Sequence, residues 1–253
     1  MKSLIKDLRF KNVSTSVLKR IIPPSMPIDS YGLFSGKTEL SLANAGWKID
    51  AHTDQLVILQ FWRCLMTDPA YMCEIISHRA FKFHSIEFNI LQERLPTYGD
   101  QYYRSCLFFL LNRCSSTGQV SCGEFNGAEY SPLALKYLKA FKRPQAFDVR
   151  ELNAIAEDTI ADNSSDNFIL FPTLKYSNNL LDVGKSIGYD TYLFNHRKLR
   201  KFIESEQKKT ALVYNYHPKL LSFYKNSNVY LIDKYANLTN STENYEEAIV
   251  TNF

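Results

Sequence analysis

Short apolar segments with strand-like character alternate along this chain with segments of helical periodicity. The helical segments repeat apolar residues every three or four positions, and the strand-like runs are bounded by glycine, proline or polar residues. Because parallel strands need a crossover connection, usually a helix, the alternation predicts an α/β fold with a parallel, doubly wound sheet. We expect strands at residues 31–34, 48–51, 147–149, 168–171, 212–216, 229–232 and 248–253, and helices at 14–22, 39–45, 55–66, 152–160 and 193–203. The last two strands are expected to pair antiparallel.

The length and composition favour one large sheet that carries an inserted lobe. The chain has 253 residues, of which 45% are hydrophobic and 14% aromatic, so it can bury a sizeable core without disulfides. We expect residues 1–70 and 145–253 to form the α/β core and residues 71–144 to form the inserted lobe. This lobe is predicted to be helical to residue 111, and residues 114–132 are then rich in Ser, Gly, Asn and Thr, as an irregular loop is.

Charge, cysteine content and hydropathy predict a cytoplasmic protein that does not enter a membrane. The formal charge of +4 is too small to indicate a nucleic-acid partner by itself. Five cysteines cannot all pair, and the N-terminal residues do not have the pattern of a signal peptide. The longest apolar run, residues 106–111, is far shorter than the roughly 20 residues of a membrane span.

A metal site is not expected. Cys64, Cys73, His78 and His84 are separated by gaps that do not match the short Cys-x-x-Cys spacing of structural zinc sites. We therefore interpret these cysteines as core thiols.

The turn after the first expected strand holds Phe34, Gly36 and Thr38. A glycine at such a turn lets the backbone approach a ligand closely, because a β-carbon would otherwise intervene. Gly36-Lys37-Thr38 ends like a phosphate-binding P-loop, but the upstream glycine, Gly32, is one position too close for that motif. The turn is therefore either a cofactor loop or an ordinary connection from strand to helix.

Four short segments follow one another in a family-specific order: residues 34–38, 112–113, 123–126 and 171–174. Together they resemble the Dam-like family of DNA adenine-N6 methyltransferases, in which Phe-x-Gly-x-Gly, Asn-Arg, Gly-x-Phe-Asn and Asp-Pro-Pro-Tyr occur in that order. The ending at residues 246–253 also resembles the closing strand of the family. The resemblance implies a Rossmann-like methyltransferase sheet that binds S-adenosylmethionine and methylates adenine in DNA.

The cofactor contacts that the resemblance implies are incomplete. Phe34 and Gly36 match the first turn, but Thr38 replaces its second glycine, and residues 9–14 lack both glycines of the family's N-terminal segment. Asp50 and Asp54 lie one residue away from the places expected for the acid that binds the ribose. We therefore expect no bound S-adenosylmethionine, and these four residues, Phe34, Gly36, Asp50 and Asp54, are its vestigial contacts.

The catalytic motif is also degraded. Phe171 replaces the Asp, Pro172 is kept, Thr173 replaces the second Pro and Leu174 replaces the Tyr. The reaction needs an acceptor for the adenine amino group and rings that hold the flipped base, and phenylalanine accepts no hydrogen bond. We expect no catalytic residue here, although Tyr176 could still stack on a base.

Residues that could contact DNA lie in two places. Arg113 and Asn126 belong to the central motifs that lead into the family's DNA-contacting hairpin, and their alternative role is to brace the loop. A helix at 193–203 would carry Arg197, Lys198, Arg200 and Lys201 on one broad face, which is either a phosphate-binding surface or simply a solvated one.

Three functional hypotheses follow. The first is a catalytically inactive relative of the methyltransferases that binds DNA or a partner protein, for example an active methyltransferase. The second is an active S-adenosylmethionine-dependent enzyme with displaced residues, using Asp50 or Asp54 for the ribose and Asp166, Asn178 or Asn179 near the base. The third is an interaction module without a ligand, in which Phe171 and Leu174 fill the old pocket.

Overall fold

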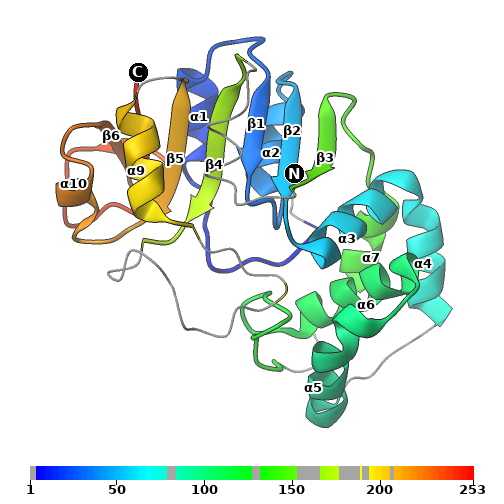
Figure 1. Ribbon diagram of the computed structural model, residues 1–253. Coiled ribbons are helices and arrows are strands. Elements are labelled where there is room, and N and C mark those ends of the chain that lie inside the picture. The colour runs from blue at the N-terminus through cyan, green and yellow to red at the C-terminus, as the bar shows by residue number, and fades with distance from the viewer. Residues whose placement is uncertain are drawn as a thin grey trace.

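One mixed sheet forms the centre of the computed structural model (Figure 1), which describes residues 4–78, 84–126, 132–152, 166–176, 189, 194–205 and 208–253. In the described residues the sheet has eight strands in the order β3-β2-β1-β4-β5-β8-β6-β7. Strands β3, β2, β1, β4 and β5 run parallel, and β8 is antiparallel to both β5 and β6. The strands are β1 (Ile28–Tyr31), β2 (Ile49–Thr53), β3 (Phe147–Glu151), β4 (Phe168–Leu174), β5 (Thr210–Asn215), β6 (Asn228–Ile232), β7 (Leu238–Thr239) and β8 (Glu247–Thr251). The predicted α/β fold class is confirmed.

Helices cover both faces of the sheet. Helices α1 (Thr15–Ile21), α2 (Lys37–Ala43) and α3 (Leu56–Thr67) share one buried cluster with the apolar side chains of β1, β2 and β3. Helix α9 (His196–Glu204) buries Leu199 and Ile203 against β4 and β5 on the opposite face. Figure 1 shows α1 and α2 behind the sheet and α9 in front of it. The short α10 (Leu220–Phe223) lies near the edge of the sheet that carries β6.

The segment between α3 and β3 forms a helical lobe beside the sheet (Figure 1). It contains α4 (Pro69–His78), α5 (Ser85–Arg94), the 3-10 turn η1 (Leu95–Thr97), α6 (Gln101–Cys114) and α7 (Pro132–Lys139). Helix α6 packs against α3 and α4, so most of its surface is buried. The buried Arg104 is satisfied by the side chain of Gln60, at 2.6 Å, and by backbone carbonyls of the lobe.

Two expected strand boundaries are wrong, and each has a physical reason. The first strand lies three residues earlier than predicted, because Gly32 has a φ of 86° and ends it. Strand β4 continues past Phe171 to Leu174 through a bulge, since Phe171 pairs with Leu212 but Leu174 pairs with Tyr214. Pro172 lacks the N–H that a regular ladder requires at this point.

The remaining elements agree with the sequence in different degrees. The predicted helix at 193–203 is α9, and β6 and β8 form the predicted antiparallel pair. Strand β7 was not predicted, and the helix expected at 152–160 lies almost wholly outside the described residues. Within the described residues, no helix has both the length and the apolar composition needed to cross a membrane.

Candidate functional site

The carboxyl ends of β1 and β4 mark the place where an open α/β sheet usually binds its ligand. These strands are neighbours, but β1 continues into α2 on one face and β4 leads to α9 on the other. Ligands in such sheets lie outside the carboxyl ends of the strands at this switch point. The site is built from the turn after β1, the end of β4 and an N-terminal segment.

The glycine of the first turn is required by the protein itself. Gly36 has a φ of 63°, and a β-carbon there would lie 2.6 Å from Cζ2 of Trp62. The indole Nε1 of Trp62 donates a hydrogen bond of 3.0 Å to the carbonyl of Phe34. Packing of Trp62 under the turn thus explains Gly36 without a cofactor.

Residues 6–12, which we call the strap, lie over this turn. The Arg9 guanidinium lies 4.4 Å from the centre of the Phe34 ring and forms two hydrogen bonds with Asp7, at 2.9 and 3.1 Å. Lys37 donates a 2.9 Å hydrogen bond to the Lys11 carbonyl. The strap therefore covers Phe34 and also engages Lys37, two residues of the turn in which the sequence suggested a cofactor loop.

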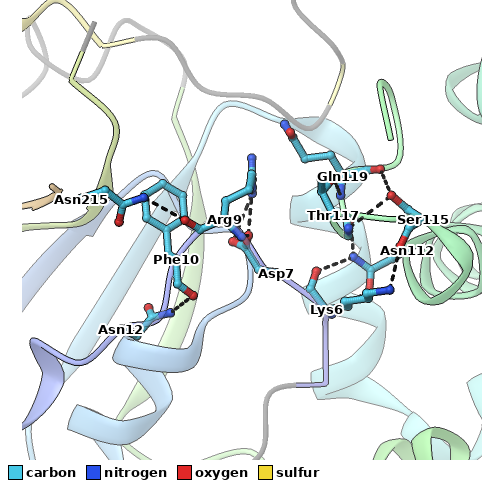
Figure 2. A network of polar contacts seen from close by, with 11 residues as sticks. Lys6, Asp7, Arg9, Phe10, Asn12, Asn112, Ser115, Thr117, Gln119 and Asn215 are labelled. Carbon is cyan, nitrogen blue, oxygen red and sulfur yellow. Dashed lines mark hydrogen bonds and ion pairs between the residues drawn. The ribbon is translucent and has the colours of Figure 1, made fainter. Parts of the chain in front are cut away.

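One part of the strap is bound by the helical lobe (Figure 2). The Asn112 side chain accepts a hydrogen bond from the Lys6 N–H at 2.8 Å and donates one to the Lys6 carbonyl at 2.9 Å. Lys6 Nζ donates to the Ser115 carbonyl at 2.8 Å, and the Leu8 N–H donates to the Thr117 carbonyl at 3.0 Å. A residue from the expected DNA-contacting region thus braces the N-terminal segment.

Two glycines of this region, Gly118 between the central motifs and Gly123 within the second one, have neighbours too close for a side chain. A β-carbon on Gly118 would lie 1.9 Å from the Lys6 carbonyl oxygen. A β-carbon on Gly123 would lie 1.9 Å from Ser115 Oγ. The Ser115 hydroxyl in turn donates a 2.6 Å hydrogen bond to the Gln119 carbonyl. These two glycines allow the loop to fold tightly against itself and against the strap.

The other part of the strap is bound at the carboxyl edge of the sheet. Asn215, the last residue of β5, donates a 2.8 Å hydrogen bond to the Arg9 carbonyl (Figure 2). The buried Glu247 carboxylate accepts the N–H groups of Asn12 and Ser14, at 2.6 and 2.9 Å. Thr38 also donates to the Asn12 side chain at 3.2 Å. The strap is therefore a bridge between the lobe and the sheet.

The site of the degraded catalytic motif is filled with aromatic rings. Phe171 is fully buried, stacks on Tyr31 at 5.4 Å and meets Phe194 edge-on at 5.2 Å. Tyr31 in turn stacks on His52 at 4.8 Å, and His52 Nε2 lies 3.2 Å from a carboxylate oxygen of Asp29. Leu174 is also buried, and Pro172 and Thr173 form the bulge. At Phe171, where the expected chemistry needs a hydrogen-bond acceptor, the described residues therefore present packed aromatic rings.

The residues proposed for the ribose, Asp50 and Asp54, and the acceptor proposed for the base, Asp166, lie in different surroundings. Asp50 is buried and forms a 2.9 Å ion pair with Arg150 of β3. Asp54 is exposed just beyond β2, and Asp166 precedes β4, at the opposite edge of the sheet from Phe171. The other two proposed acceptors, Asn178 and Asn179, lie outside the described residues.

The residues expected to contact DNA differ in exposure. Arg113 is half-buried at the end of α6, and Asn126 is exposed in the loop, where its N–H donates to the Cys114 carbonyl at 2.9 Å. On α9, three of the four basic residues, Arg197, Lys198 and Lys201, are exposed. Arg200 is half-buried between Glu204, at 2.9 Å, and the Phe223 ring, at 5.2 Å.

In the same buried cluster as Phe171 and Leu174, the structure holds a chain of hydrogen-bonded polar side chains that the sequence did not reveal. Tyr224 Oη lies 2.8 Å from Tyr214 Oη, which lies 3.1 Å from His196 Nδ1. Burial raises the pKa of Tyr224 well above its ordinary value. The rings of Tyr176 and His217 pack next to this chain, 4.6 Å apart. Tyr176 was the one ring near the motif that the sequence analysis singled out, and it lies within this cluster.

Comparison with known proteins adds no relative to this description. No family model matches the chain, and no curated protein matches it. Among the described residues, no group of three or more His, Cys, Asp or Glu side chains is arranged to hold a metal ion.

Proposed function

We propose that this chain is a methyltransferase-like protein that binds DNA and does not transfer methyl groups. The sheet is compatible with the Rossmann-like fold that the resemblance implies, because it has five parallel strands and helices on both faces. Fold alone does not carry function, so the argument depends on the sites.

The absence of methyl transfer is argued from Phe171. Activation of an adenine amino group needs a hydrogen-bond acceptor beside it, and Phe171 is instead packed between Tyr31 and Phe194. The strap adds to this argument, because Arg9, which is paired with Asp7, lies on the Phe34 ring at the switch point. Both features favour the inactive relative over an enzyme with displaced residues.

The observation that carries DNA binding is the basic outer face of α9. Arg197, Lys198 and Lys201 are exposed, and Glu204 is the one acidic residue of the helix and is paired with Arg200. The helix begins beside the carboxyl end of β5, since His196 Nδ1 lies 3.1 Å from the hydroxyl of Tyr214. A row of exposed cations near that edge is suited to DNA phosphates, which release counterions when they are neutralised.

The test is DNA binding by a triple variant, Arg197→Gln, Lys198→Gln and Lys201→Gln, measured by fluorescence anisotropy with a duplex of roughly 20 base pairs. We expect the affinity at low salt to fall at least about tenfold and the slope of log K against log salt to decrease in magnitude by about 2 to 3. The matched control removes three exposed cations elsewhere, with Lys48→Gln, Lys225→Gln and Lys234→Gln. Equal binding by the two triple variants would exclude α9 as the DNA-binding surface.

A further inference from the structure

The Arg9 side chain is held in place by hydrogen bonds along one edge of its guanidinium, and the other described residues leave its end edge open. Asp7 accepts hydrogen bonds from Nε and Nη2, which together form the side edge of the guanidinium. Guanidinium has five N–H donors in a planar fork, so three remain on Nη1 and Nη2. No described residue accepts a hydrogen bond from Nη1, and the Arg9 side chain is 24% exposed while that of Asp7 is only 3% exposed.

Three contacts fix the orientation of this group. The Phe34 ring lies against the guanidinium at 4.4 Å, Asp7 holds the side edge, and Asn215 fixes the Arg9 backbone through its carbonyl. Figure 2 shows the guanidinium pointing away from the backbone of the strap. An arginine that is already oriented loses little side-chain entropy when it binds a planar anion.

We propose that the end edge of Arg9, formed by Nη1 and Nη2, binds an oxyanion of the carboxylate or phosphate class. The two nitrogens match the spacing of two oxygens on such a group. The position also favours a ligand, because Phe34 belongs to the turn after β1 at the switch point of the sheet. This site is separate from α9 and does not depend on DNA binding by that helix.

Local charge indicates a modest affinity. Arg9 and the neighbouring Lys6, Lys11 and Lys37 carry four positive charges. Asp7, Glu246 and Glu247 carry three negative charges, which leaves a net charge of +1. The lysine ammonium groups are directed to backbone carbonyls or to Glu246. Recognition therefore comes from the geometry of one guanidinium edge, for which a dissociation constant on the order of millimolar is expected for a free anion.

The test follows the Cζ resonance of Arg9 by NMR in the full chain during titration with sodium phosphate and, separately, sodium acetate at constant ionic strength. We expect a saturable shift for Arg9 and only a small linear shift for the exposed Arg197. The variant Arg9→Lys keeps the charge but lacks the planar edge. Its titration is followed through the backbone amide resonance of Phe34, and it should bind at least about tenfold more weakly than the natural protein followed in the same way. Arg197→Lys is the matched control and should bind the anion as the natural protein does.

The same resonance distinguishes the two sources of the anion. Saturation by a short single-stranded oligonucleotide at much lower concentration than by inorganic phosphate would assign the site to a nucleic-acid backbone, and similar behaviour of both would assign it to a small molecule. The proposal is overturned if no saturable shift of the Arg9 resonance occurs with any of the three probes. This measurement uses the natural protein, so it decides the proposal even if Arg9→Lys fails to fold. If Arg9 shows no saturable shift while DNA still binds through α9, the Arg9 site alone is rejected and the proposed function stands.

Discussion

At the scale of single residues, glycines with left-handed backbone are required for different reasons. Gly118 has a φ of 92° and lies against the Lys6 carbonyl, so both its conformation and its lack of a side chain matter. Gly46 has a φ of 106°, but a β-carbon there would meet nothing within 4 Å. Gly99 has neither constraint. The central loop is thus built around the strap, and its motif residues serve that contact.

These three glycines give a graded prediction for substitution by alanine. Gly99→Ala should change the free energy of unfolding by less than about 0.5 kcal/mol, and Gly46→Ala should lower it by about 1 to 2 kcal/mol through backbone strain alone. Gly118→Ala should lower it by more than about 3 kcal/mol, because the strap backbone must also move. Urea denaturation of the three variants measures the series. Equal effects of Gly46→Ala and Gly118→Ala would show that the strap does not pack against the loop.

The sequence identified several of the right residues but not what they do. Gly36 and Asn112 stand in motifs that suggest a cofactor and DNA, and in the structure they accommodate Trp62 and the strap. The roles of Asn112 and Glu247 depend on contacts with Lys6 and Asn12, more than 100 residues away in each case. Local spacing carries no signal for such contacts. Asp7 and Arg9 were missed because nothing in the sequence shows that the strap lies on Phe34.

At the scale of elements, the packing of α2 on β1 buries a carboxyl group. Glu39 of α2 is 3% exposed, and the Ser30 hydroxyl of β1 donates to it at 3.3 Å. Desolvation raises the pKa of Glu39 from 4.5 to about 7, and the hydrogen bonds that it accepts only partly oppose this rise. The packing of α2 on the sheet is therefore most stable when the Glu39 carboxyl group is protonated.

The stability should consequently depend on pH in a definite direction. The native state holds the Glu39 proton more tightly than the unfolded state does. The contribution of Glu39 to the free energy of unfolding is therefore complete below pH 4.5 and is lost as the pH rises through about 7. The loss is on the order of 3 kcal/mol. Urea denaturation between these pH values should show a decrease in the natural protein that is absent in Glu39→Gln, the control. A parallel pH profile of the variant would contradict this assignment.

Most elements could be predicted from periodicity, whereas their ends could not. The helices α1, α2 and α3 and the parallel strands follow from apolar spacing and turn residues, as the expected fold class did. The start of β1 was misplaced because the apolar Leu33 and Phe34 lie in the turn between two left-handed glycines. The extension of β4 through a bulge at Pro172 was not predictable, because proline normally indicates the end of a strand.

At the scale of the whole molecule, the strap joins parts of the fold that the chain order keeps apart. It binds the end of α6 through Asn112, the end of β5 through Asn215 and the start of β8 through Glu247. In doing so it places Arg9 on Phe34 at the switch point of the sheet. The place where the resemblance implies a cofactor is therefore occupied by the protein's own residues.

Calorimetric titration of S-adenosylmethionine into the full chain tests this claim most directly. We expect no saturable heat at ligand concentrations up to about 0.1 mM, since one guanidinium edge alone supports a binding free energy no stronger than about −4 kcal/mol, which is a dissociation constant on the order of millimolar. A dissociation constant in the micromolar range would contradict it, because the strap and the Trp62 packing would then have to leave a working cofactor site.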